Sequence, residues 1–350
     1  MKKIIVLFLF LVVVIVGVLF WQNGNIAKND DASQMAGDDV AVIGLLTGYG
    51  GLGDRAFNDM QYKGMVDARR KYGIEFHYLA PEQGDNLALM IEKLIHLGCS
   101  MVICGEGYVA ESPVMQMASR YPEIKFVVLD YELPEFLPNI ASVSFKQNEG
   151  SFLAGALAAM TTKSKSVGMI GGEPIEVILD FYKGFEVGAK YIDESVNVDV
   201  EYLSEHDSKD VWADPLTGEK VAKKMIADEK SDILYGVAAA SNLGIFHACK
   251  AQNCYAIGVD TDQGHLAPGT VLTSMMKRLD NAIVDIIGKF LHGEFENRHY
   301  HYGLPNGVSL APLRYGEGNV PAEISETLRR IQKQIEAGEL QVPSQFNGAE

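Results

Sequence analysis

The sequence predicts an α/β protein made of two doubly wound lobes joined by a hinge, and two patterns support this. From Val40 onward, short apolar runs alternate with longer amphipathic runs, as parallel strands alternate with crossover helices. The alternation restarts near residue 146, so that each series has the size of an ordinary domain. The chain therefore contains two similar sheets, and a ligand is expected to bind between them.

Five apolar runs in each series are candidate strands, and amphipathic runs between them are candidate helices. The strands of the first series lie at 40–46, 74–79, 100–104, 124–130 and 140–145, with helices near 57–72, 85–98 and 111–121. Those of the second lie at 166–172, 196–203, 232–237, 255–260 and 270–276, with helices near 150–162, 176–192, 217–228, 242–251 and 279–291. Because the carboxyl ends of parallel strands face the space between the lobes, residues that follow strands are candidate ligand contacts.

The amino-terminal segment predicts export. Lys2 and Lys3 precede an uncharged apolar run at 4–21, and a polar linker follows at 22–39. A helix over this run, at about 1.5 Å per residue, is about 27 Å long and matches the hydrocarbon core of a bilayer. Because no good Ala-x-Ala site follows, an uncleaved anchor is favoured, while a cleaved signal peptide stays open. In both cases the positive-inside rule places the rest of the chain outside the cytoplasm.

The composition excludes several classes of protein. Of the 350 residues, 47% are hydrophobic, which rules out a disordered tail, a coiled coil and a disulfide-rich miniprotein. The chain carries 46 acidic and 30 basic side chains, a formal charge of −16. Because binding to phosphates needs a basic face, we expect no nucleic-acid partner.

The four cysteines predict neither a metal site nor a lipid anchor. Cys99 and Cys104 bracket a strand and lie about 16 Å apart, too far for a disulfide. Cys249 and Cys254 straddle a helix-to-strand turn where pairing is feasible, although buried thiols are favoured. No cysteine closely follows the apolar run to accept a lipid, and the eight histidines fall at no zinc-ligand spacing relative to the cysteines. We therefore expect no metal and no cofactor.

A glycine motif at 48–53, GYGGLG, matches the dinucleotide fingerprint G-x-G-x-x-G. Its context argues against that function. The first acidic residue at the end of the second strand is Glu82, too far along the chain, and the helix opens only after Asp54. We interpret the motif as a flexible turn between strand and helix.

Five ordered blocks carry a resemblance to a known family. The segment GDRAFND at 53–59 is similar to a D-x-S-F-N signature, and VSFKQNEGSFLAG at 143–155 to an F-x-x-x-E-G-S-F-L-A-G block. Further blocks lie at 171–188, at 257–263 (IGVDTDQ) and at 272–277 (LTSMMK). In these blocks the chain resembles the basic membrane protein family of substrate-binding proteins, also called the purine nucleoside receptor family.

The resemblance covers about residues 40–315 and implies both a fold and a function. The fold is that of type I periplasmic-binding proteins, with two Rossmann-like lobes. The function is that of the extracytoplasmic subunit of an ABC importer, which binds a purine nucleoside and works with ABC permease and ATPase subunits. Two departures are visible: the lipid-bearing cysteine usual in the family is absent, and Ala56 replaces the usual Ser.

We expect each lobe to consist of two separate segments of a monomeric protein. The segments are 40–145 plus about 273–305 for the amino-terminal lobe, 146–272 plus about 306–340 for the carboxyl-terminal lobe, and a tail at 341–350.

The resemblance implies an aromatic sandwich around a nucleobase, with one ring from each lobe. Phe57 matches the first ring, and Trp212 falls where the family commonly has an aromatic residue before Asp-Pro. Stacking of a base on an aromatic ring contributes about 1–3 kcal/mol. The alternatives are a core residue on the first helix for Phe57 and a packing residue of a surface loop for Trp212.

The first helix also offers two polar candidates. Asn58 carries a donor and an acceptor that suit the edge of a purine, although a capping residue in the first turn is the alternative. Asp54 directly precedes the helix and is the expected cap, as well as a candidate ligand contact.

Strand ends supply the remaining candidates. Asp130 and Asp260 close strands, and a carboxylate can accept two vicinal hydroxyls such as those of ribose. Lys277 would donate to ribose oxygens, although a structural ion-pair network at the hinge is the alternative for all three. Gly236 would allow close approach of the backbone, and Asp262 and Gln263 are weaker candidates. Because Arg55 and Lys277 face at least four acids, we expect a neutral nucleoside rather than a nucleotide.

Three other functions stay open. The same fold binding riboflavin or a sugar-like ligand is an alternative within the family. A membrane-tethered ligand sensor is a second alternative. A nucleoside hydrolase is a third, but no Asp-rich metal loop and no Ser/His/Asp spacing supports catalysis.

Overall fold

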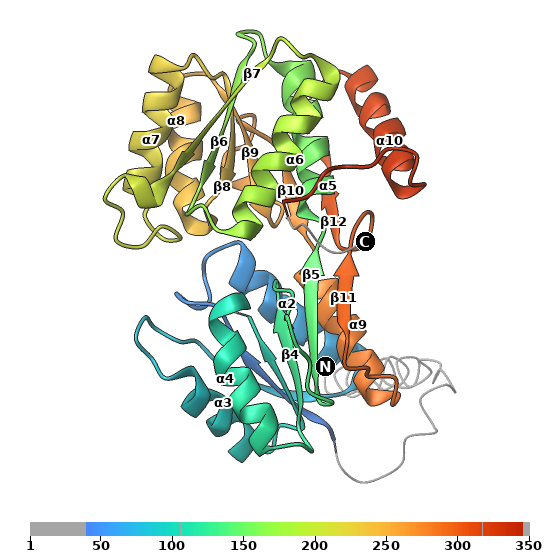
Figure 1. The fold of residues 1–350 in the computed structure, drawn as a ribbon. Helices are drawn as coiled ribbons and strands as arrows, with labels where there is room; N and C mark the ends of the chain where they lie inside the picture. Colours follow the sequence, from blue (N-terminus) through green and yellow to red (C-terminus); the bar gives the residue numbers. More distant parts are fainter. Residues whose placement is uncertain (1–39, 106, 317, 346–350) are drawn as a thin grey trace, which may run out of the picture. The chain divides into compact units, whose positions relative to one another are not determined.

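The computed structural model describes residues 40–345 except 106 and 317. Its elements form two six-stranded sheets, each covered by helices, which confirms two α/β lobes (Figure 1). The predicted anchor at 1–21, the linker at 22–39 and the last five residues of the tail lie outside the described residues. Within the described part of the chain, no helix combines the length and the apolar character needed to cross a membrane.

The first sheet is entirely parallel and has the order β11-β5-β4-β3-β1-β2. Its strands are β1 (Val42–Leu46), β2 (Glu75–Leu79), β3 (Met101–Cys104), β4 (Lys125–Leu129), β5 (Ile140–Phe145) and β11 (His299–Tyr302). Its helices are α2 (Phe57–Tyr72), α3 (Leu87–His96), α4 (Gly107–Arg120) and α9 (Leu279–Leu291). Side chains alternate between two cores: Ile43 and Leu45 pack with α2 and α9, while Val102 and Cys104 pack with α3 and α4.

The second sheet has the order β12-β10-β9-β8-β6-β7, with β12 antiparallel to β10 and the others parallel. Its strands are β6 (Ser166–Gly171), β7 (Asn197–Tyr202), β8 (Ile233–Val237), β9 (Tyr255–Asp260), β10 (Val271–Lys277) and β12 (Val308–Leu310). Its helices are α5 (Gln147–Thr161), α6 (Glu176–Ile192), α7 (Pro215–Asp228), α8 (Asn242–Ala251) and α10 (Ala322–Glu336). Strand order and position therefore correspond between the two sheets.

The sixth strand of each sheet comes from the carboxyl-terminal part of the chain, and neither strand was predicted. β11 adds to the edge of the first sheet beside β5, and β12 to the edge of the second beside β10. The chain thus crosses between the sheets after β5, after β10 and between β11 and β12. The boundary predicted near 273 needs correction, because it falls inside β10, which pairs with β9 in the second sheet. The crossing follows Lys277.

All four cysteines are free and buried, so that the feasible pairing of Cys249 with Cys254 is not formed. Burial raises the pKa of the Cys99 thiol to about 11 and that of the Cys104 thiol to about 12. The four buried thiols are therefore packing groups, two in each lobe.

Helices α5 and α6 pack with their backbones in close contact, because glycines face each other across the interface. A Cβ atom on Gly155 would lie 2.0 Å from the carbonyl oxygen of Phe185, and one on Gly188 would lie 2.0 Å from that of Phe152. Gly155 and Gly188 belong to two of the blocks that carry the family resemblance. These blocks therefore include residues that bring the two helices together.

Replacing Gly188 with alanine is expected to lower the free energy of unfolding by about 1–3 kcal/mol or more, although alanine favours helices, because the new methyl group meets backbone. Urea denaturation measures the change. Gly44→Ala is the control, since its Cβ would meet only side-chain atoms, the nearest at 3.2 Å. A Gly188→Ala protein as stable as the wild type would contradict this account of the interface.

Candidate functional site

A cleft of about 680 Å³ is lined by loops at the carboxyl ends of strands from both sheets. This volume is that of a typical site for a small molecule. Seven of the eight predicted site residues line it, namely Asp54, Phe57, Asn58, Asp130, Trp212, Asp260 and Lys277. The structure thus brings together side chains that lie more than 200 residues apart in the sequence.

Gly236 does not line the cleft, and its predicted role needs correction. A Cβ atom on Gly236 would lie 2.6 Å from Oδ1 of Asn242, so the missing side chain makes room for that amide rather than for a ligand. Asn242 Nδ2 in turn donates to the Gly236 carbonyl oxygen at 3.0 Å. The next residue, Val237, lines the cleft instead, because successive side chains of a strand point to opposite sides.

Asp54 caps helix α2, as predicted. Its carboxylate accepts hydrogen bonds from the backbone N–H groups of Ala56 at 2.9 Å, Asn58 at 2.8 Å and Asp59 at 3.2 Å. Burial raises the pKa of Asp54, and the backbone hydrogen bonds oppose this shift. These hydrogen bonds fix the first turn of α2, which begins at Phe57. Asp54 also lines the cleft.

Asn58 fixes the glycine-rich loop in place. It is 4% exposed, its Oδ1 accepts from the backbone N–H of Gly48 at 2.8 Å, and its Nδ2 donates to the carbonyl oxygen of Tyr49 at 3.2 Å. Both of these hydrogen bonds go to the loop before α2 rather than to the helix itself. The predicted donor and acceptor are thus both in use, and one Nδ2 hydrogen is left for a ligand.

The two predicted rings, Phe57 and Trp212, line the cleft from different lobes. Trp212 lies against the backbone of Gly172, where a Cβ atom would be 2.4 Å from its ring. Ser241 holds the loop around Trp212: its Oγ donates to the carbonyl oxygen of Val211 at 2.9 Å and accepts from the N–H of Asp214 at 2.7 Å. The indole is therefore held in position by its surroundings.

Lys277 is a buried cation that pairs with Asp130. It is 1% exposed, and its Nζ lies 2.5 Å and 2.6 Å from the two carboxylate oxygens of Asp130. Three rings surround the ammonium group, with centroids at 5.9 Å for Phe57, 5.5 Å for Phe145 and 5.1 Å for Phe181. The ion pair joins the two sheets at the cleft, and Phe181 is a lining residue that the sequence analysis missed.

Asp260 is a buried carboxylate that accepts no hydrogen bond from the described residues. It is 7% exposed, and burial raises its pKa to about 7; Lys277 opposes this shift, while Asp54 and Asp130 add to it. Asp130 and Asp260 follow or end equivalent strands of the two sheets, and both adopt left-handed backbone conformations, with φ of 58° and 63°. The oxygens of Asp260 are therefore available to a hydrogen-bond donor in the cleft.

The cleft is acidic, as predicted. Among its described lining residues the cation is Lys277, and the acids are Asp54, Glu82, Asp130, Glu173, Asp210 and Asp260. Arg55 was counted as a cleft residue from the sequence but does not line it. Since Asp130 already pairs with Lys277, the site offers little to an anionic ligand.

Arg55 instead contributes its backbone to a contact between the lobes. Its carbonyl oxygen accepts from Thr261 Oγ1 at 2.6 Å and from Gln263 Nε2 at 3.3 Å. Gln263, a weaker candidate, is 1% exposed and does not line the cleft. Asp262 also lies outside the lining and pairs with Arg314. The block IGVDTDQ thus supplies Asp260 as a ligand candidate, and its residues Thr261 and Gln263 hold the two lobes together.

Comparisons with known proteins agree with this architecture. A model of the family described as "ABC transporter substrate-binding protein PnrA-like" matches residues 41–345. The ABC transporter nucleoside-binding protein BmpA of Lactococcus lactis is 27% identical over 91% of this chain and 93% of its own. An uncharacterised lipoprotein of Pyrococcus abyssi is 27% identical over 77% of this chain and 69% of its own length.

A solved structure shows the same fold. An ABC transporter solute-binding protein of Aeropyrum pernix superposes with a TM-score of 0.77 at 22% identity, over 87% of this chain and 94% of that chain. The predicted periplasmic-binding-protein fold is therefore confirmed.

Proposed function

Because the chain belongs to the family of PnrA-like substrate-binding proteins of ABC transporters, we propose that it binds a purine nucleoside in the cleft and delivers it to ABC permease and ATPase subunits. The observation that carries the proposal is the combination of two rings from different lobes, Phe57 and Trp212, with the unengaged carboxylate of Asp260. A planar base and vicinal hydroxyls are the chemical features that such a site recognises.

Each part of the ligand has a partner in the proposed complex. The base stacks between Phe57 and Trp212, and the remaining Nδ2 hydrogen of Asn58 donates to its edge. Asp260 accepts the 2′ and 3′ hydroxyls of the ribose, and Lys277 donates to ribose oxygens while Asp130 holds its ammonium group in position. The acidic lining favours a neutral nucleoside over a nucleotide.

Replacing either ring with alanine tests the stacking directly. Phe57→Ala and Trp212→Ala should each weaken nucleoside binding by about 1–3 kcal/mol, which is about 5- to 150-fold in Kd. Isothermal titration with adenosine, guanosine and inosine measures the change. The control is Tyr78→Ala, which removes an aromatic ring that is 44% exposed on β2 and outside the cleft.

The same titration can overturn the ligand assignment. If none of the three nucleosides produces heat while riboflavin or a sugar does, the proposed ligand is wrong and the aromatic cleft serves another compound. Incubation with inosine then tests for catalysis, because release of free hypoxanthine would make the protein a hydrolase rather than a binding subunit.

We further propose that the protein acts outside the cytoplasm, held to the membrane by the apolar segment at 4–21. A membrane-tethered ligand sensor stays the alternative role for such an anchored cleft. Fractionation of cells, followed by carbonate and detergent extraction, separates an anchored chain from a released one.

A further inference from the structure

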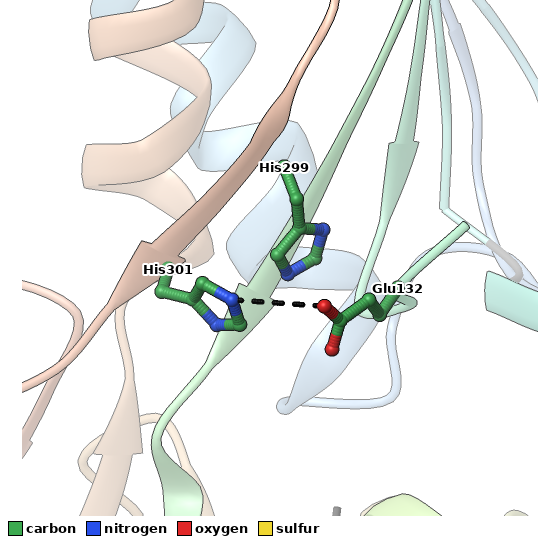
Figure 2. Close-up of side chains that lie close together, drawn as sticks. All are labelled: Glu132, His299 and His301. Carbon is green, nitrogen blue, oxygen red and sulfur yellow. Dashed lines mark ion pairs between the residues drawn. The ribbon is translucent and has the colours of Figure 1, made fainter. Parts of the chain in front are cut away.

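A second cluster of functional side chains lies outside the cleft, at the edge of the first sheet. His299 and His301 are two residues apart on β11, so both side chains point to the same face, and Glu132 follows β4 (Figure 2). One imidazole nitrogen from each histidine and one carboxylate oxygen of Glu132 all lie within 4.8 Å of one another. His301 Nε2 is 3.9 Å from Oε1 of Glu132. None of the three residues lines the cleft.

The neighbouring strand orients both imidazoles. In the register of β5 and β11, Ser142 is paired with His299 and Ser144 with His301. Nδ1 of His299 lies 2.5 Å from the Ser142 hydroxyl, and Nδ1 of His301 lies 2.9 Å from the Ser144 hydroxyl. If each Nδ1–H donates to its serine, both Nε2 atoms carry the lone pair. Metal-binding histidines are commonly held in one tautomer by such an outer hydrogen bond.

Burial lowers the pKa of His299 to about 3, with the charges of His301 and Arg298 adding to the shift, and burial also lowers the pKa of His301.

We propose that Glu132, His299 and His301 bind a divalent first-row transition-metal ion such as Zn²⁺. Two imidazoles and one carboxylate are a ligand set that suits Zn²⁺ and the ions near it in the Irving–Williams order. Tetrahedral bonds of about 2.0–2.1 Å place ligand atoms roughly 3.3 Å apart, so ligand atoms that lie up to 4.8 Å apart must approach each other by up to about 1.5 Å.

The side chains that must move are accessible. The side chains of His301 and Glu132 are 50% and 41% exposed, which leaves room for rotation and a path for the ion. Nε2 of His299 lies 2.8 Å from the Ser144 hydroxyl, and the ion would replace the Ser144 hydrogen at that nitrogen while the Ser144 oxygen still accepts from Nδ1 of His301. The bound ion would connect the loop after β4 to the edge strand β11.

Titration of the metal-stripped full-length protein with Co²⁺ tests the site, because the visible spectrum of Co²⁺ reports its coordination. We expect one equivalent to bind with a tetrahedral spectrum, and Zn²⁺ to displace it. His299→Ala, His301→Ala and Glu132→Gln should each weaken binding at least about tenfold, and Ser142→Ala about 10- to 100-fold with the stoichiometry kept. His247→Ala is the matched control, since His247 pairs with one carboxylate, that of Glu219 at 3.1 Å, and lies on the other lobe.

Two outcomes overturn the proposal: no saturable binding of Co²⁺ or Zn²⁺ by the wild type, or unchanged binding by a His299→Ala/His301→Ala double variant. Glu132→Gln changes an exposed side chain and keeps the assay decisive if a histidine variant fails to fold. Circular dichroism of each variant verifies that a loss of metal binding is not a loss of structure.

Discussion

Replacing Lys277 with methionine is expected to lower the free energy of unfolding by about 3–5 kcal/mol, because it leaves a buried carboxylate without its counter-ion. Both carboxylate oxygens of Asp130 contact Lys277 Nζ, and the charge of Lys277 also lowers the pKa of Asp260. Methionine has a similar length and keeps the contacts with Phe145 and Phe181. The loss of stability therefore comes from the missing charge and not from a cavity. Denaturation by guanidinium chloride measures the difference.

A double variant and a control test whether the loss of stability comes from the unpaired buried charge. Lys277→Met/Asp130→Leu removes both charges and should recover much of the stability, since apolar pairs can replace buried ion pairs. Lys63→Met should cost far less, because Lys63 is half-exposed and Asp280 keeps Arg278 as a partner. A loss for Lys277→Met no larger than that for Lys63→Met would show that the buried pair does not stabilise the fold.

Replacing Asp260 with asparagine is expected to stabilise the ligand-free protein at pH 8 by about 4 kcal/mol, the free energy that corresponds to a rise in pKa from 3.8 to about 7. The folded protein holds the proton on Asp260 up to a pKa of about 7, whereas the ordinary value is 3.8. Between these two values the folded state binds more protons than the unfolded state. The stability of the wild type therefore falls as the pH rises from about 4 to 7, and the contribution of Asp260 is constant above that range.

The difference between wild type and Asp260→Asn, measured by urea denaturation at several pH values, isolates this group from all others. Asp210→Asn is the control, because Asp210 is an exposed acid of the same cleft. Nucleoside binding should show the opposite trend: it should strengthen as the pH rises through 7, since the ionised carboxylate accepts the ribose hydroxyls. A wild-type stability that follows the Asp260→Asn curve across this range would contradict the raised pKa.

The elements that the sequence predicted well are those with a clear local signal. Helices α2, α6, α8 and α9 and strands β5 and β9 lie at their predicted bounds, because each has a strong period or a continuous apolar run. β11 was missed since His299–Tyr302 alternates histidine and tyrosine at a sheet edge, and β12 has only three residues. The pairing of both with distant strands is a tertiary effect that no local pattern carries.

The site was predicted in composition but not in its internal contacts. Residues at strand ends, such as Asp130 and Asp260, follow from topology alone. The sequence does not specify the side-chain directions on which two of these contacts depend. They are the hydrogen bond of Asn58 to the glycine-rich loop and the packing of Asn242 against Gly236. The proposed metal site was missed because Glu132, after β4, and His299, on β11, come together only through the pairing of both strands with β5.

The late position of β11 and β12 has a consequence for synthesis of the protein. Until residues 299–310 have left the ribosome, β5 and β10 each form one edge of their sheet and expose the backbone groups that β11 and β12 later pair with. A nascent or truncated chain that ends before residue 299 thus exposes two strand edges in addition to those of β2 and β7, and other chains can add strands there. β5 and β10 are covered only in the last sixth of translation, so we expect a prematurely terminated chain to be prone to aggregation.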